Sequence, residues 1–161
     1  MAIQKSMTKE LIEKFTVGVL RSKPAARIPT RSFDTDLGYD LYLSEDEIIL
    51  PPGVVTKVPT GIALQFPPLV GGLIRDRSGI STSATPVFVV AGVIDPTYRG
   101  EIIVAMFNPG PSEVVFTQGS RIAQLILLPV SLLNMREIFA FDATELDESL
   151  RGDRGFGSTG A

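Results

Sequence analysis

The residues with the clearest chemical potential lie in one stretch, 91–101, which holds a carboxylate, an aromatic ring and a guanidinium. A carboxylate can accept a proton from water and so act as a general base. The stretch joins two runs rich in β-branched and aromatic residues, 87–90 and 102–107, which together predict a β-hairpin. The Asp-Pro pair at its centre fits a tight turn, and Asp95 could equally serve only to cap that turn.

The composition narrows the chemistry to carboxylates. The 161 residues include no His and no Cys, which removes the usual general base, the usual transition-metal ligands and the thiol nucleophile. Carboxylate chemistry remains, together with a hard cation such as Mg²⁺ that prefers oxygen ligands. A net charge of −3 argues against a broad nucleic-acid surface, because such a surface needs a basic face.

The arginines are distributed as if to bind a small anion. All five lysines precede residue 58, whereas seven of the ten arginines lie at position 75 or beyond, among Gly-rich turns. Guanidinium binds phosphate oxygens in a planar, bidentate manner. After Arg77, the small residues 78–84 could form one helical turn whose N–H groups face an anion. An ordinary Ser-rich loop is the alternative.

The C-terminal residues 143–161 differ in character from the rest of the chain. An acidic run is followed by a Gly-rich segment in which Phe156 has Gly on both sides, with arginines before it and hydroxyls after it. Such a segment cannot pack as a core strand. A frayed terminus would explain it, but stacking on a flat ligand explains the large ring better. We therefore expect a mobile arm that contacts a ring and phosphates.

A β fold must position these segments. Short β-rich runs alternate with turn formers, and there is scarcely any helical period. This pattern predicts an all-β fold, an antiparallel sandwich or distorted jelly-roll barrel with little helix. The expected strands, besides the two arms of the hairpin, are 15–20, 39–43, 47–50, 54–58, 62–66, 70–75, 113–117, 122–128 and 135–141.

One β domain accounts for most of the chain, since 161 residues with 44% hydrophobic side chains can bury a real core. We place an N-terminal extension with a possible short helix at 1–14, the β domain at 15–142 and the arm at 143–161. We find no apolar run long enough to span a membrane and no apolar region of a secretory signal. We therefore expect a cytoplasmic protein without membrane or nucleic-acid partners.

Five segments, taken in order, resemble the motifs of the homotrimeric dUTP pyrophosphatase (dUTPase) family. Each is common by chance, but the set in this order and spacing is specific. The segments are Gly38-Tyr39-Asp40-Leu41, Arg77-Ser78-Gly79, Gly92-Val93-Ile94-Asp95 with Tyr98-Arg99-Gly100, Gly119-Ser120-Arg121-Ile122-Ala123-Gln124-Leu125, and Arg151-Gly152 with Gly155-Phe156-Gly157-Ser158-Thr159-Gly160.

The resemblance implies a fold, an assembly and a reaction. The fold is the dUTPase-like jelly roll, and the assembly is a homotrimer that builds each site from three chains. The reaction is the hydrolysis of dUTP to dUMP and pyrophosphate by water attacking the α-phosphorus, with Mg²⁺ on the triphosphate. Such an enzyme supplies dUMP and limits the incorporation of uracil into DNA.

The resemblance also implies roles for individual residues. Asp95 is the base or water-orienting group beside the deoxyribose, and Tyr98 packs under the sugar and rejects ribonucleotides. Asp40 is the second catalytic carboxylate and orients the phosphates or the hydrated Mg²⁺. Main-chain groups around Val89, Gly92, Val93 and Ile94 read uracil. The triphosphate is held by Arg77, Ser78, Gly79 and Gln124, and the arm contributes Arg151 to the γ-phosphate, Phe156 stacked on uracil, and Gly157, Ser158 and Thr159 as further ligands.

Two positions depart from the family pattern. Arg154 stands where the family has Gly, so either Arg151 or Arg154 could meet the γ-phosphate. Asp76 stands where the family commonly has Pro, which puts a negative charge beside the phosphate ligands unless it faces a neighbouring arginine such as Arg75 or Arg99. We interpret Arg121 as one half of a surface ion pair.

Three other functions fit the same fold. A dCTP deaminase needs a Glu on the strand after the hairpin, where this chain has Ala105. A non-catalytic nucleotide sensor would be favoured if Asp95 or Asp40 were missing, and both are present. A structural jelly roll of capsid or lectin type leaves the Gly-Phe-Gly arm without a purpose.

Overall fold

The computed structural model describes residues 16–131. The short helix expected at 8–14, the strand at 135–141, the arm at 143–161 and both domain boundaries lie outside the described residues. Within them the fold is a β-sandwich, as predicted, and its strands pair antiparallel throughout.

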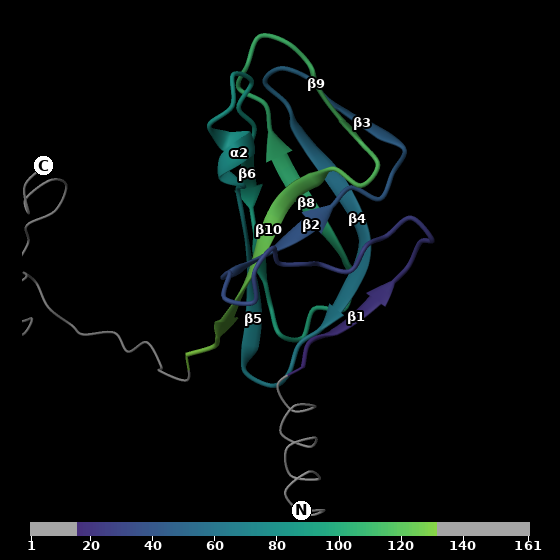
Figure 1. Ribbon diagram of the computed structural model, residues 1–161, viewed down its shortest axis with the longest axis vertical. Helices are drawn as coiled ribbons and strands as arrows, with labels where there is room; N and C mark the ends of the chain where they lie inside the picture. The colour runs from purple at the N-terminus through teal and green to yellow at the C-terminus, as the bar shows by residue number, and fades with distance from the viewer. Residues whose placement is uncertain (1–15, 132–161) are drawn as a thin grey trace, which may run out of the picture. The chain divides into compact units, whose positions relative to one another are not determined.

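Two four-stranded sheets form the sandwich, and a two-stranded sheet lies at one end (Figure 1). The first sheet has the order β1 (Gly18–Arg21), β4 (Val55–Gln65), β8 (Glu101–Phe107) and β6 (Phe88–Ala91). The second has the order β2 (Gly38–Tyr42), β10 (Arg121–Pro129), β5 (Val70–Arg75) and β7 (Val93–Ile94). The small sheet pairs β3 (Glu47–Leu50) with β9 (Val114–Thr117), and the described residues contain one helix, α2 (Ser78–Ser81).

The core follows from the period of two in the strands. In β8, Ile102, Val104 and Met106 are at most 1% exposed, while the residues between them are only partly covered or exposed. Leu41 of β2 and Ile122 of β10 belong to the same core. Burial of these apolar side chains between the sheets is the main stabilising contribution to such a fold.

The two strands expected at 54–58 and 62–66 are a single strand, β4, so the break between them that the turn formers Pro59, Thr60 and Gly61 favour in the sequence is wrong. The chain bends there without leaving the sheet, because Gly61 adopts a φ of 68° and the register with β8 shifts between Pro59 and Ala63. Such a bulge kinks a strand and increases its twist. The Glu101 carboxylate accepts the Gly61 N–H at 2.7 Å and holds the bend in place.

The predicted hairpin is confirmed, and it contains a crossing between the sheets. Its arms pair as β6 and β8, with Phe88 opposite Phe107 and Val89 opposite Met106. Between them β7 leaves this sheet and pairs with β5 of the other. The crossing needs Gly92, because a Cβ there would lie 2.4 Å from the Ile74 carbonyl oxygen. The turn that carries Asp95 therefore comes directly after the point where the chain passes from one sheet to the other.

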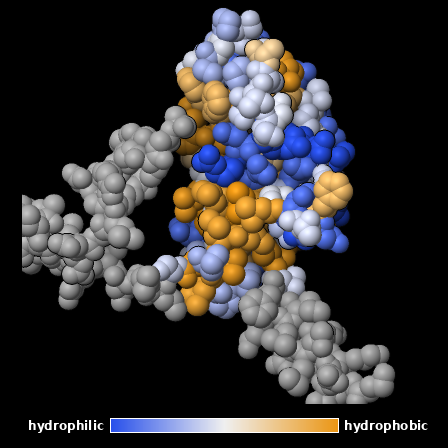
Figure 2. Space-filling model, turned by 60° about the vertical axis from the view of Figure 1, so that its left-hand side comes forward, coloured by the Kyte–Doolittle hydropathy of each residue, from blue (hydrophilic) through white to orange (hydrophobic). Residues whose placement is uncertain are grey.

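The surface carries several exposed apolar side chains, among them Val93, Phe33 and Leu37 at 77%, 72% and 70% exposure. Figure 2 shows a hydrophobic area on one face beside a band of hydrophilic residues. Apolar surface rimmed by polar residues is typical of a contact region. Within residues 16–131, no helix is both long and apolar enough to cross a membrane.

Candidate functional site

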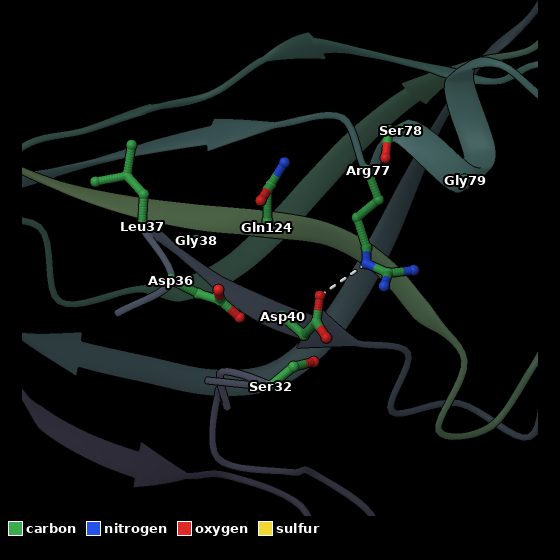
Figure 3. Close-up of a pocket in the computed structure, with 9 residues that line it drawn as sticks. All are labelled: Ser32, Asp36, Leu37, Gly38, Asp40, Arg77, Ser78, Gly79 and Gln124. Atoms are coloured by element: carbon green, nitrogen blue, oxygen red, sulfur yellow. Dashed lines mark hydrogen bonds and ion pairs between the residues drawn. The ribbon is translucent and has the colours of Figure 1, made fainter. Parts of the chain in front are cut away.

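A pocket of about 320 Å³ forms where β2 and β10 meet the beginning of α2. The antiparallel register places Gln124 of β10 opposite Asp40 of β2 on one side and Arg75 of β5 on the other. Figure 3 shows Asp40, Gln124 and Arg77 brought together in this way. The lining residues are Ser32, Asp36, Leu37, Gly38, Asp40, Arg77, Ser78, Gly79 and Gln124. We call this the phosphate pocket.

Asp40 organises two arginines at the phosphate pocket. Its side chain is 14% exposed, and its Oδ1 accepts a hydrogen bond from Arg77 Nε at 2.7 Å. Arg121 Nη1 lies 3.3 Å from the other carboxylate oxygen, which confirms the ion pair expected for that residue. Neither terminal nitrogen of Arg77 has a partner among residues 16–131. Arg77 is therefore oriented by Asp40 through one nitrogen and keeps two for an anion.

The segment after Arg77 forms the predicted helical turn. Ile80 and Ser81 donate their N–H groups to the Arg77 carbonyl at 2.9 and 3.0 Å. The N–H groups of Ser78 and Gly79 precede these bonds and belong to the orphan donors of a helix beginning. A Cβ at Gly79 would meet nothing within 4 Å, so packing does not require glycine there and a ligand has room to approach.

The Gln124 amide fills the space that a side chain at position 38 would need. A Cβ at Gly38 would lie 2.1 Å from Gln124 Oε1, so only glycine leaves room for the amide. Gln124 Nε2 donates to the Asp76 carbonyl at 2.7 Å, which supplies the partner that a part-buried amide needs. This bond leaves Oε1 on the pocket side as an acceptor and fixes the amide's orientation.

A second, smaller pocket of about 170 Å³ lies at the Asp95 turn, and we call it the carboxylate pocket. Its lining residues are Val93, Ile94, Asp95, Tyr98, Glu101 and Ile103. The Asp95 carbonyl accepts the Tyr98 N–H at 3.0 Å, which confirms the predicted turn. The Asp95 carboxylate has no hydrogen bond or ion pair within the described residues, so it does not cap the turn. It is exposed and available to a substrate or water.

Tyr98 is positioned by the residues that follow it. Its ring lies where a Cβ of Gly100 would be, 2.4 Å from the Tyr98 hydroxyl oxygen, and that hydroxyl donates to the Glu101 carbonyl at 3.0 Å. At 45% exposure the ring is a surface feature rather than part of the core. Arg99 donates to the Pro96 and Tyr98 carbonyls at 2.7 and 2.8 Å and so stabilises the turn.

The segment expected to read uracil borders only the carboxylate pocket. Val93 and Ile94 line the carboxylate pocket, whereas Val89 and Gly92 line neither pocket. Two of its main-chain groups are already bonded, since Val89 donates to the Asp76 carboxylate and the Gly92 carbonyl accepts from Ile74 at 2.7 Å. Asp76 therefore faces the Val89 main chain rather than Arg75 or Arg99.

The predicted site residues fall into two groups within one chain. Asp40, Arg77, Ser78, Gly79 and Gln124 share the phosphate pocket, and Val93, Ile94, Asp95 and Tyr98 share the carboxylate pocket, with no lining residue in common. The predicted arm residues Arg151, Phe156, Gly157, Ser158 and Thr159 lie outside the described residues.

Sequence reasoning missed four residues of the phosphate pocket. Ser32, Asp36 and Leu37 come from an irregular segment before β2 that has no period or motif. Gly38 opens the first of the five motifs, and its spacing before Asp40 was the available signal. In the carboxylate pocket, Glu101 and Ile103 of β8 were also missed. Their strand was predicted, but not the face on which they lie.

Comparison with known proteins agrees with this geometry. A family model described as dUTPase matches residues 25–160. A deoxyuridine 5'-triphosphate nucleotidohydrolase of Mycobacterium marinum is 41% identical over 90% of this chain and 95% of its own length, and that of Mycobacterium leprae is 42% identical over the same shares. The dUTPase of Staphylococcus bacteriophage 80alpha, solved with dUpNHpp, superposes with a TM-score of 0.77 at 26% identity, covering 91% of this chain and 99% of that one. The chain belongs to the dUTPase family.

Proposed function

We propose that this protein hydrolyses dUTP to dUMP and pyrophosphate in the cytoplasm. The observation that carries the proposal is the unpartnered Asp95 carboxylate beside Tyr98, in a chain that also presents an arginine, hydroxyl and amide pocket for phosphates. The mycobacterial relatives are named for this reaction. The dCTP deaminase alternative is not favoured, because Ala105 of β8 offers no group for acid–base chemistry.

Each pocket supports one half of the reaction. Arg77, held by Asp40, and the N–H groups of Ser78 and Gly79 bind the triphosphate oxygens. Asp95 takes a proton from water as that water attacks the α-phosphorus. The new P–O bond forms to water, the bond from the α-phosphorus to the bridging oxygen breaks, and pyrophosphate leaves with the electron pair.

Mg²⁺ completes the charge balance at the phosphates. The described residues contain no group of three or more acidic side chains that could hold a metal ion by themselves. Substrate phosphates would hold most of the ion's coordination, Asp40 would contribute through water, and the bound ion would supply positive charge for the phosphate oxygens. This arrangement suits Asp40, whose oxygens already face two arginines.

Substrate selection belongs to the carboxylate pocket. Tyr98, which the Gly100 backbone accommodates, packs under the deoxyribose and leaves no room for a 2′-hydroxyl. Main-chain groups at Val89, Gly92, Val93 and Ile94 read the uracil edge. A site with fixed polar groups rejects the wrong base because those groups would be left unpaired.

The separation of the pockets supports a homotrimer in which one chain supplies the phosphate pocket and another the carboxylate pocket. Exposed apolar side chains such as Val93 and Leu37 border the two pockets and would be covered by a neighbouring chain. The arm at 143–161 closes the site: Arg151 meets the γ-phosphate, Phe156 stacks on uracil, and Gly157, Ser158 and Thr159 add donors. Closure excludes water and strengthens the charge interactions inside.

The test is pyrophosphate release from dUTP with Mg²⁺, comparing the parent chain with Asp95→Asn and with Glu113→Gln as a matched control. Glu113 is exposed and lines neither pocket. The parent and the control turn over, whereas Asp95→Asn loses a factor of about 10² to 10⁴ while remaining folded. Full activity of Asp95→Asn, or ammonia release from dCTP by the parent, would refute the proposal.

A further inference from the structure

Asp76 lines neither pocket, but it is bonded to the 89–94 segment and to Gln124 of the phosphate pocket. It lies between β5 and α2, next to Arg77, and is partly buried. Its carboxylate Oδ1 accepts the N–H of Val89 in β6 at 2.5 Å. Its main-chain carbonyl accepts Gln124 Nε2 at 2.7 Å. One residue thus contacts both the segment expected to read the base and a side chain of the phosphate pocket.

The Asp76 carboxylate extends the row of hydrogen bonds between β5 and the 89–94 segment past the last main-chain bond. From Gly72 opposite Ile94, pairing runs through Leu73 opposite Val93 to the bond from Ile74 N–H to the Gly92 carbonyl. In the described part of the chain no main-chain hydrogen bond joins these segments beyond Ile74, and the next hydrogen bond is that of the Asp76 side chain with Val89. Because β6 is the outer strand of its sheet, its outward N–H has no strand partner. Asp76 supplies the missing acceptor.

The negative charge of Asp76 does not oppose phosphate binding. Its carboxylate is directed to an N–H of the opposite sheet, and the residue is absent from the lining of the phosphate pocket. The neighbouring Arg77 meanwhile turns to Asp40. At the position where the family commonly has Pro, Asp76 therefore holds Val89 and does not repel the phosphates.

We propose that Asp76 is a positioning residue that anchors the 89–94 segment at Val89 and the Gln124 amide, which each chain would contribute to neighbouring sites of the trimer, and that it thereby sets the affinity and base selectivity for dUTP. The inference rests on the proposed function for its kinetic consequence. Its structural consequence, the protection of the Val89 N–H from exchange, depends only on the observed hydrogen bond.

The kinetic test compares Asp76→Ala with Asp76→Asn, since Asn keeps an oxygen acceptor and loses only the charge. We expect Asp76→Ala to raise KM for dUTP about tenfold, as loss of a hydrogen bond to a charged group predicts, with kcat changed less. The ratio of kcat/KM for dUTP to kcat/KM for dCTP falls as well. Asp76→Asn recovers KM to within about threefold of the parent. Glu47→Ala, an exposed acid on β3 outside both pockets, serves as the control.

The structural test is amide hydrogen exchange of the full-length protein without substrate. The Val89 N–H should exchange faster in Asp76→Ala than in the parent or in Asp76→Asn, while the N–H of buried Val104 stays protected in all three. Unchanged Val89 exchange in Asp76→Ala, or equal KM in Asp76→Ala and the parent, overturns the inference. A parent that fails to hydrolyse dUTP overturns the proposed function instead, and the exchange result still decides the role of Asp76.

Discussion

One functional side chain in each pocket fills space that a glycine leaves open. Gly38 makes room for the Gln124 amide, and Gly100 makes room for the Tyr98 ring. In both cases the glycine has a negative φ, so space rather than backbone conformation is the reason for it. The functional residue and its glycine therefore form a unit, and changing either should disturb the other.

Gly38→Ala should impair activity with little loss of stability. The added Cβ would lie 2.1 Å from Gln124 Oε1, and the flexible amide can move away at low cost but then loses its bond to the Asp76 carbonyl. We expect KM for dUTP to rise about tenfold, with the melting temperature nearly unchanged. The check is a double-mutant cycle with Gln124→Ala: additive losses would show that Gly38 acts independently of the amide.

Gly100→Ala should weaken discrimination against ribonucleotides. A Cβ there overlaps the Tyr98 hydroxyl, so the ring must leave its position in the carboxylate pocket. The measurement is the ratio of kcat/KM for dUTP and UTP, which we expect to fall about tenfold. Gly18→Ala, where the nearest side-chain atom lies 3.4 Å from an added Cβ, is the matched control. An unchanged ratio in Gly100→Ala would remove Tyr98 from sugar selection.

At the residue scale, the motifs predicted which side chains lie together, while the roles of those side chains stay predictions. Asp40, Arg77 and Gln124 lie together as the motifs implied. Ser32 and Asp36 were not foreseen, because they reach the pocket from an irregular segment whose path depends on packing. Here Asp36 accepts the Phe33 N–H at 2.9 Å, a local bond that leaves no sequence period.

At the element scale, strand existence was predictable and strand continuity was not. The strands at 47–50 and 70–75 have the predicted bounds. The Pro-Thr-Gly signal in β4 predicted a turn, but pairing with β8 on both sides of the bulge keeps the strand continuous. Local turn preference was overridden by tertiary pairing, which a single sequence does not display.

The turn between β8 and β9 depends on one buried amide. Asn108 is 1% exposed, donates to the Leu50 and Ser112 carbonyls at 2.8 Å each and accepts the Gly110 N–H at 2.9 Å. Asn108→Ala leaves these groups without partners and should lower the free energy of unfolding by about 3 kcal/mol. Urea denaturation measures this loss, and hydrolysis at low temperature should persist.

An exposed residue of the same region provides the control. Val115→Ala on β9, 49% exposed in the native protein, should change the free energy of unfolding by less than about 0.5 kcal/mol. If the two variants were equally stable, the Asn108 bonds would contribute nothing to the turn.

At the scale of the whole molecule, the period of two in the strands predicted the β-sandwich. The spacing of the motifs along the chain did not show that their residues divide between two pockets. Motifs that follow one another along the chain end in two separate pockets, because β7 runs antiparallel to β5 and carries the chain toward Gly72, away from the end of β5 that leads to Arg77. Only the family resemblance indicated that several chains build one site.

A mixing experiment tests the shared site. Asp95→Asn and Arg77→Ala are each expected to be inactive alone, since each damages one pocket. In randomly mixed trimers about one quarter of the sites combine an intact Asp95 from one chain with an intact Arg77 from another, and activity should return to that level. Light scattering on the parent should give three times the 17.3 kDa of one chain. A monomer mass, or no recovery on mixing, would exclude a site built between chains.

The separation of Asp95 from the arginines of the phosphate pocket also bears on which molecules can be hydrolysed. Within residues 16–131 the acid is exposed and forms no ion pair with a cation of its own chain. In the proposed trimeric site, free pyrophosphate would bind the arginines without reaching the acid, and a bare nucleoside would meet the acid without bringing phosphorus to it. A molecule with a sugar at one end and a phosphate chain at the other would bring the scissile bond and the acid together.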